Sequence, residues 1–383
     1  MTTLPVQGPV LQWARKFRGL SERDAAGLLG ISVVELKAYE LGELAVTLGA
    51  FENFASKYRL PQATLFALTA PDEPPKPKDF RTIEGKKAQQ SFDFGIALSN
   101  VRTWLSQYKR IASEDEEFES PALPHVSMHE KPDVVGERER KRLGISPQAQ
   151  LSWPPHEAFR RWRASLEARG VIVFQQKFPM VDCKGFTLYE SESAPTIIIN
   201  KTEQLDAAKI FTLAHEYCHL LLRQPGISNE NFDDPVESFC NKFAAAFLIP
   251  SDLLRLLLPY WPNQPVTWRQ EDINLWATRI KVSRIALALR LEQLGLAPDG
   301  FHVRFKRKKR VAAPERPQRK SKPDPTVVHL SDIGGAYTKK IIGAMDRRVI
   351  DETHAAEALG VSVTNFEKAR HAIKRHGELA IGG

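Results

Sequence analysis

Two segments in the middle of the chain have apolar residues spaced as on helices that bury one face. In residues 204–222 and 234–248 these positions recur every three or four residues, which is the period of an α-helix. They are Phe211, Ala214, Cys218 and Leu222 in the first segment and Phe239, Phe243 and Phe247 in the second. The pattern predicts two helices with matching apolar faces.

Further helices and two short strands are predicted around this pair. The amphipathic segments 92–113 and 157–169 indicate helices, and the β-branched runs 171–175 and 196–199 indicate strands. The second run precedes the helix at 204–222, where a free backbone edge would line a cleft and pair with an extended peptide. An interior strand without a free edge is equally consistent with this pattern. The chain is predicted to be an α+β protein that is mostly helical.

The first of the two central helices carries a short metal-binding motif. Residues 215–219 read His-Glu-Tyr-Cys-His, an H-E-x-x-H box. On a helix, His215 and His219 lie one turn apart and direct both imidazoles to the same side, so that they can bind one metal ion. Glu216 then lies beside an open coordination position, where it can act as a general base.

Two histidines do not complete a zinc site, so a third protein ligand is required. Glu237, on the second central helix, is the best candidate in the sequence. A chance occurrence of the box is the alternative, but the box borders an apolar stripe and a carboxylate follows on the next helix. Zinc is the expected ion, and the ligand set also suits manganese. A donor for a developing oxyanion is not selected by spacing, and the candidates are Tyr189, Tyr260 and His302.

The segments around these residues resemble the ImmA/IrrE family of metallopeptidases. The resemblance rests mainly on the run from Ile210 to Leu222 (IFTLAHEYCHLLL) and the run from Glu237 to Pro250 (ESFCNKFAAAFLIP). Shorter matches are Gly185-Phe186, residues 195–200 (PTIIIN), Ala277 with Val282-Ser283, and Arg290-Leu291. Together they cover about residues 150–296.

This resemblance implies a zincin-like core and a role for each residue of the motif. His215, His219 and Glu237 would bind zinc or another divalent ion, and Glu216 would be the catalytic carboxylate. Asn241, one turn beyond Glu237, would support the site without binding the metal. The sequence departs from the family at Ala208, near where the family often carries a basic residue.

Residues 10–68 read as a compact, all-helical unit. Ser21 and Ser32 are N-cap candidates, and Gly30 between them can take the left-handed conformation that a helix-turn-helix needs. This segment resembles the Xre/Cro-type helix-turn-helix family over about sixty residues.

The second helix of the predicted helix-turn-helix is poorly suited to reading DNA bases. Its candidate DNA contacts are Ser32, Val33, Val34 and Lys37, whereas base readers usually present Arg, Asn, Gln or Ser. The unit contains seven Lys and Arg against six Asp and Glu, so it lacks a basic footprint. Two readings therefore remain open, namely sequence-specific DNA binding and protein docking or dimerisation.

The net charge of +8 is concentrated in one run. The segment from Arg304 to Lys322 contains ten Lys and Arg against one Glu, with interspersed prolines. Its densest part, the candidate for phosphate contacts, is Lys306, Arg307, Lys308, Lys309 and Arg310. Such a run either binds nucleic acid by neutralising phosphates or is a solvated tether.

The C-terminal segment echoes the N-terminal one. Residues 354–363 (HAAEALGVSV) resemble residues 24–33 (DAAGLLGISV). The end of the chain is therefore predicted to be a small helical unit, either another helix-turn-helix or an ordinary helical hairpin.

These observations predict five parts and an intracellular setting. The parts are a helix-turn-helix domain (1–69), a linker and helical connecting region (70–149), a metallopeptidase domain (150–300), a basic flexible linker (301–326) and a small helical C-terminal domain (327–383). Three widely spaced cysteines without a C-x-x-C pair, Cys183, Cys218 and Cys240, argue against a disulfide framework and against a cysteine zinc knot. No signal or membrane-spanning run is recognised, so we expect a cytoplasmic protein without membrane attachment, and a homodimer is left open.

Two functions from different classes fit the sequence. The first is a metal-dependent endopeptidase that cleaves a regulatory protein; the family resemblance implies a helix-turn-helix repressor or an antitoxin, in a stress, mobile-element or defence circuit. The second is a DNA-binding transcriptional regulator whose peptidase-like core senses a ligand or metal. A proteolytic toxin controlled by an antitoxin would share the chemistry of the first. The complete H-E-x-x-H box with Glu237 favours the peptidase, because a sensor has no need of Glu216.

Overall fold

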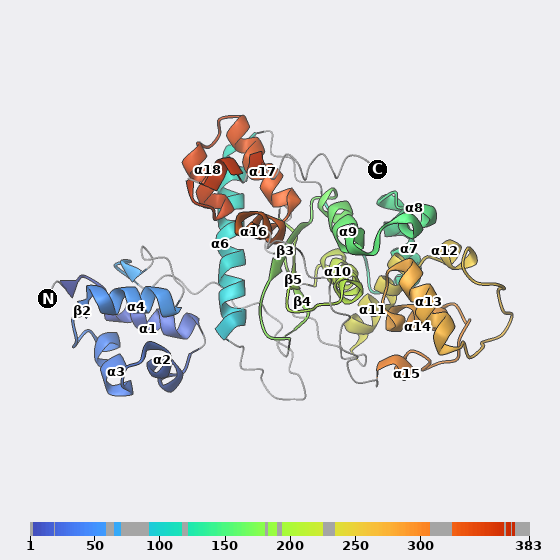
Figure 1. Ribbon diagram of the computed structural model, residues 1–383, viewed down its shortest axis with the longest axis horizontal. Helices are drawn as coiled ribbons and strands as arrows, with labels where there is room; N and C mark the ends of the chain where they lie inside the picture. The colour runs from blue at the N-terminus through green and yellow to red at the C-terminus, as the bar shows by residue number, and fades with distance from the viewer. Residues whose placement is uncertain are drawn as a thin grey trace. The chain divides into compact units, whose positions relative to one another are not determined.

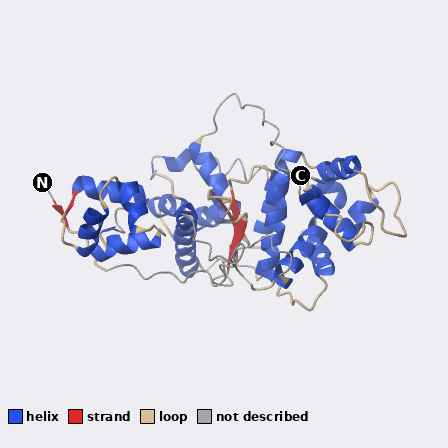
Figure 2. Cartoon of the chain, turned by 90° about the horizontal axis from the view of Figure 1, so that it is seen from below, coloured by secondary structure: helices blue, strands red, loops and turns tan. Residues whose placement is uncertain are grey.

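The computed structural model contains two compact units, each described here by itself (Figure 1). The structure describes residues 3–18, 20–58, 65–69, 92–116, 122–180, 183–189, 194–224, 234–306, 324–363, 365–368 and 370–371. The first unit contains the described residues up to Arg102 together with 177–180, and the second contains the others. Helices dominate and the strands are few and short, so the prediction of a mostly helical α+β protein is confirmed (Figure 2).

Four short helices around one apolar core form most of the first unit. They are α1 (Gly8–Phe17), α2 (Glu22–Leu29), α3 (Val33–Leu41) and α4 (Leu48–Tyr58). The two-residue strands β1 (Thr3–Leu4) and β2 (Val46–Thr47) pair antiparallel beside them. A buried, two-pronged ion pair also ties α1 to α3, with Arg15 Nε 2.6 Å from Glu40 Oε1 and Arg15 Nη2 2.8 Å from Glu40 Oε2.

The turn between α2 and α3 has the local chemistry that the sequence predicts. The Ser21 hydroxyl caps α2 by accepting from the backbone N–H of Asp24, and Ser32 caps α3 in the same way with Glu35. Gly30 has φ +72°, a left-handed conformation that costs a residue without a Cβ little. The same turn recurs twice in the second unit, at Lys281 (φ +64°) and Gly360 (φ +66°).

A three-stranded sheet lies at the centre of the second unit. Its strands are β3 (Ile172–Gln176), β4 (Gly185–Leu188) and β5 (Thr196–Asn200), in the order β3-β5-β4. Strand β5 pairs parallel with β3 and antiparallel with β4. The run at 196–199 is therefore an interior strand, and the expectation that it forms the rim of a cleft is wrong. Among the described strands, β4 is the sheet edge on the side opposite β3.

Both faces of this sheet are buried, which fits the apolar runs Ile172–Phe174 and Ile197–Ile199 in its two parallel strands. On one face, Val173 and Ile197 join the main core with α9 (Ala158–Glu167) and α10 (Asp206–Leu221). On the other face, the Phe174 ring contacts Trp104 (5.2 Å) and Tyr337 (5.5 Å between centroids). These two residues come from α6 (Phe92–Glu114) and α17 (Gly335–Asp346), and α16 (Pro325–Ile333) also packs on β3 (Figure 1).

The helix that follows the H-E-x-x-H helix, α11 (Pro235–Leu248), is held along its length and at its end. It packs so closely on α7 (Pro132–Arg142) that position 136 has no room for a side chain, and a glycine stands there. An added Cβ at Gly136 would lie 2.7 Å from the Phe243 carbonyl oxygen and 2.9 Å from the Phe247 nitrogen.

The last carbonyls of this helix accept hydrogen bonds from three buried side chains. The bonds are Arg140 to Phe247 (3.1 Å), Gln150 to Leu248 (3.2 Å) and Arg290 to Ile249 (2.9 Å). Two of the donors are cations at the negative end of the helix dipole. The contacts satisfy carbonyls that the helix itself leaves unpaired.

The remaining elements complete the second unit. They are α8 (Pro147–Ser152), η2 (Pro155–Glu157), α12 (Ser251–Arg255), α13 (Gln270–Ile280), α14 (Arg284–Gln293), α15 (Val303–Lys306) and α18 (Glu352–Leu359). Among the described helices, none combines the length and the apolar character that crossing a membrane requires. The boundaries of the five predicted parts stay predictions.

The close packing at Gly136 predicts a sharp response to a single methyl group. We expect Gly136→Ala to lower the free energy of unfolding of the second unit by about 1–3 kcal/mol, because the backbone of α11 must move. Urea unfolding followed by tryptophan fluorescence measures this, since six of the seven tryptophans belong to that unit. Gly343→Ala on α17 is the matched control, because its Cβ would meet only the end of the Arg347 side chain at 3.2 Å. Equal stability of the two variants would contradict the packing argument.

Candidate metal centre

The crossing of α10 and α11 brings the three proposed ligands together. His215 Nε2 lies 3.2 Å from His219 Nε2, and each of these nitrogens lies close to the Glu237 carboxylate. The distances are 3.1 Å from His215 Nε2 to Glu237 Oε2 and 3.4 Å from His219 Nε2 to Glu237 Oε1. All three residues are buried. Two imidazoles one turn apart on one helix thus face a carboxylate from the start of another.

These separations fit a bound divalent cation. Zn–N and Zn–O bonds of about 2.0–2.1 Å at tetrahedral angles place neighbouring ligand atoms roughly 3.3 Å apart. The distance between the two nitrogens, and the distance from each nitrogen to a carboxylate oxygen of Glu237, lie close to that value. Nitrogen donors together with a carboxylate suit zinc and also manganese.

The imidazoles are oriented by hydrogen-bond partners at their other nitrogens. His215 Nδ1 lies 3.0 Å from Asn241 Oδ1, and His219 Nδ1 lies 3.2 Å from the Gln224 carbonyl oxygen. Because both partners are acceptors, the Nδ1–H of each imidazole donates to its partner and the ring turns Nε2 toward Glu237, where a metal would bind. Asn241 thus occupies the supporting position that the sequence predicts, and the sequence analysis did not identify Gln224.

Glu216 is fully buried on the same helix as the two histidines (0 % exposed). Strand β4 approaches it at Gly185, where an added Cβ would lie 3.3 Å from Glu216 Cγ and 2.7 Å from Thr212 Cγ2. The glycine lets β4 pass close to α10 beside the proposed general base. This close approach gives a physical reason for the Gly185-Phe186 pair in the sequence.

The carboxylate of Glu237 is held in its charged form. Burial alone would raise its pKa, but the imidazoles of His215 and His219 lower the pKa to about 2. The site therefore offers a negative charge toward the point where the three donor atoms meet.

A cysteine that the sequence analysis set aside also belongs to this cluster. The sulfur of Cys240 and one ring nitrogen each of His215 and His219 all lie within 4.8 Å of one another. Cys240 is fully buried, and burial raises the pKa of its thiol. Its spacing of three residues from Glu237 was the available signal, because that spacing puts both side chains on one face of α11.

The three oxyanion-donor candidates each contact other side chains. His302 Nδ1 lies 2.9 Å from both carboxylate oxygens of Glu292, and Tyr260 packs on the ring of Trp268. The guanidinium of Arg223 lies over the ring of Tyr189. The structure selects none of the three for that role.

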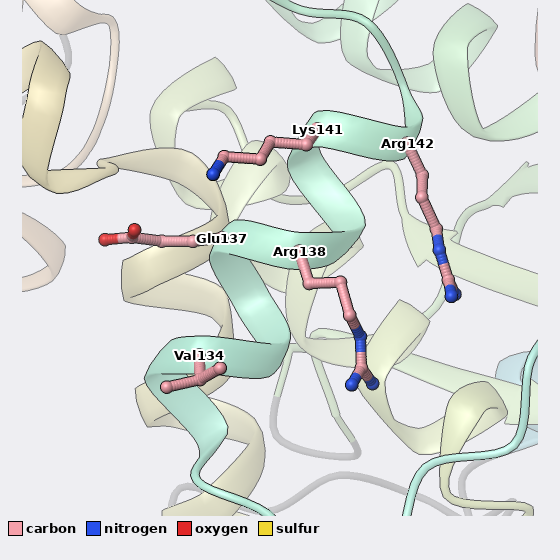
Figure 3. Close-up of a pocket in the computed structure, with 5 residues that line it drawn as sticks. All are labelled: Val134, Glu137, Arg138, Lys141 and Arg142. Atoms are coloured by element: carbon pink, nitrogen blue, oxygen red, sulfur yellow. The ribbon is translucent and has the colours of Figure 1, made fainter.

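A pocket of about 520 Å³ lies elsewhere in the second unit, along α7 (Figure 3). It is lined by Val134, Glu137, Arg138, Lys141 and Arg142. Glu137 and Lys141 leave the helix on one side and Arg138 and Arg142 on the other. None of the proposed metal ligands lines this pocket, and its guanidinium groups form ion pairs with glutamates, such as Arg138 with Glu130 at 2.7 Å.

The predicted nucleic-acid contacts are only partly described. Ser32 caps α3, and Lys37 forms an ion pair with Glu22 at 3.0 Å. Val34 is 79 % exposed and Val33 36 %, so the start of α3 presents apolar side chains. Lys306 ends α15, while Arg307, Lys308, Lys309 and Arg310 lie outside the described residues.

Comparison with known proteins supports a metallopeptidase-like region. Residues 166–292 match the family model Peptidase_M78, described as the IrrE N-terminal-like domain. This span is about a third of the chain and contains every proposed ligand as well as Glu216 and Asn241. The resemblance to ImmA/IrrE metallopeptidases is thereby confirmed for this region.

The other comparisons add little. No curated protein matches the chain. One solved structure, PlcR of Bacillus thuringiensis in complex with the peptide PapR7 and DNA, aligns over 98 % of this chain and 99 % of its own at 10 % identity. Its TM-score is 0.15, which is no evidence of a shared fold. The Xre-like assignment of the first unit stays a prediction.

The contact between Asn241 and His215 predicts a measurable loss of metal affinity. We expect Asn241→Ala to weaken Zn²⁺ binding by about 10–100-fold, because His215 loses the acceptor that fixes its tautomer. Competition with a chromophoric chelator measures the affinity. Lys242→Ala, at the exposed neighbouring position of α11, should bind zinc as the wild type does. Unchanged affinity in Asn241→Ala would show that the contact does not support a metal ligand.

Proposed function

We propose that the second unit contains a zincin-like metal-dependent endopeptidase that cleaves a regulatory protein. The observation that carries this proposal is the convergence of His215, His219 and Glu237, with Glu216 buried on the same helix. The match of residues 166–292 to the IrrE N-terminal-like domain supports it. Zinc is the proposed ion, with manganese as the alternative.

Each residue of the proposed site has its own role in peptide hydrolysis. A divalent ion at this site supplies polarisation of the scissile carbonyl and a nucleophile at neutral pH. His215, His219 and Glu237 hold that ion, and Asn241 keeps His215 in the correct tautomer. Glu216 accepts the proton of the attacking water and passes it to the leaving amine nitrogen. Burial of Glu216 places this proton transfer away from bulk solvent.

The first unit is proposed to recruit the target, a helix-turn-helix repressor or an antitoxin. Protein docking is favoured over base reading at the start of α3 by the exposed Val33 and Val34 and by the ion pair of Lys37 with Glu22. Exposed apolar side chains gain free energy by contact with a protein surface and gain none from phosphates.

Replacing the proposed base tests the peptidase directly. We expect Glu216→Gln to abolish cleavage while metal content stays near that of the wild type, because the substitution removes the base and no ligand. Mapping of new protein N-termini in cells that express each form measures this. New termini confined to one regulatory protein, and absent with Glu216→Gln, would establish the activity and identify the substrate.

The opposite result would favour a different function. Equal sets of N-termini in both strains, with metal confirmed in both purified proteins, would exclude the peptidase. Binding of the wild type to duplex DNA at low salt would then identify the chain as a regulator with a sensing core.

A charge added at the start of α3 separates docking from DNA binding. We expect Val34→Lys to slow cleavage of the natural target, because a charge would enter an apolar contact, while cleavage of an unrelated peptide stays unchanged. If α3 reads DNA instead, the added cation gains a phosphate contact and strengthens duplex binding. Target cleavage rates and duplex affinity at fixed salt distinguish these outcomes. Lys57→Ala, on α4, is the control at an exposed site of the same unit.

A further inference from the structure

We infer that Cys240 is a fourth protein ligand of the metal held by His215, His219 and Glu237. This inference rests on the metal site of the proposed function. The sulfur and the two histidine ring nitrogens lie within 4.8 Å of one another, in a fully buried cluster. Cys240 lies within the run from Glu237 to Pro250, but neither the H-E-x-x-H box nor the family resemblance gives it a role.

The position of Cys240 on α11 explains how it reaches the cluster. It follows Glu237 by three residues, so the two side chains lie on one face of the helix. The Glu237 carboxylate contacts both imidazoles at 3.1 and 3.4 Å, so this face of the helix is turned toward the histidines. A side chain one turn further along that face is directed into the same cluster.

The chemistry of a thiol suits this role. On binding, the sulfur loses its proton to solvent and a metal–sulfur bond forms, because a coordinating thiol is deprotonated outright. A Zn–S bond is about 2.3 Å long, against about 2.0–2.1 Å for Zn–N, so one zinc ion can bind sulfur and nitrogen ligands at similar distances. A thiolate also favours zinc over manganese, which prefers oxygen ligands.

A fourth protein ligand changes what the site can do. Sites with four protein ligands are closed and structural, whereas hydrolytic zinc sites keep one position open for water or substrate. With Cys240 bound, the centre is closed to a substrate carbonyl. Release of the thiolate leaves the His-His-Glu set with an open position, so Cys240 would hold the peptidase in a latent form.

Cobalt substitution of the full chain tests this ligand. Co²⁺ in the site gives visible absorption whatever the ligands, and a thiolate ligand adds a sulfur-to-cobalt charge-transfer band in the near ultraviolet. We expect both signals in the wild type and in Cys183→Ser, and only the visible absorption in Cys240→Ser and Cys240→Ala. Cys183 is the matched control, because it is a buried free cysteine of the same unit that lies outside both α10 and α11.

Zinc affinity gives a second readout. By chelator competition, Cys240→Ala should bind Zn²⁺ at least about tenfold more weakly than Cys183→Ala, because loss of a hydrogen-bond partner of a metal ligand already weakens binding by that factor. The preference for Zn²⁺ over Mn²⁺ should shrink in the same variant.

The outcomes separate this inference from the proposed function. Visible cobalt absorption without a charge-transfer band in the wild type would overturn the role of Cys240 and leave the His-His-Glu site intact. A charge-transfer band that persists in both Cys240 variants would overturn it as well. Absence of all cobalt absorption would overturn both the inference and the metal-dependent function.

Discussion

The site depends on the crossing of two helices, α10 and α11. Neither helix holds a metal site alone, since one supplies two imidazoles and the other a carboxylate and a thiol. Buried groups of this kind are costly unless they are paired. Close packing on α7 and the capped carbonyls at the end of α11 fix the crossing. A small shift of α11 would separate the donor atoms.

The three-stranded sheet also supports this crossing, because its strands β4 and β5 pack against α10. Its strand β4 comes close to Glu216 because Gly185 has no side chain to obstruct it. The opposite face of the sheet is covered by aromatic residues of α6 and α17, such as Trp104 and Tyr337 around Phe174. The C-terminal helix α17 therefore contributes to the burial of the central sheet. Displacement of α6 and α17 would expose the strands of the sheet, which packs against α10, the helix that carries Glu216.

Local signals in the sequence were sufficient for the turn between α2 and α3, but not for the strand β2, which lies in a segment predicted to be all-helical and pairs with β1 from outside it. Ser21, Gly30 and Ser32 each act on their own segment, as N-caps and a left-handed turn, so the helix boundaries follow from neighbouring residues. The ion pair of Arg15 with Glu40 joins residues far apart in the chain and was not foreseen. The partner of this unit is not fixed by such signals, because the same turn serves DNA and protein recognition.

The sequence by itself predicted the two histidine ligands, because the four-residue spacing of His215 and His219 fixes their geometry within one helix. It also determined the mostly helical class, since hydrophobic periodicity is local. The tertiary structure alone decided that the run at 196–199 is an interior strand, because β-branched composition does not reveal which neighbours pair with a strand. It alone placed Gln224 behind His219 and Cys240 beside both histidines. These contacts arise where separate elements meet; the spacing of Cys240 from Glu237 indicates a shared helix face, but not which residues that face contacts.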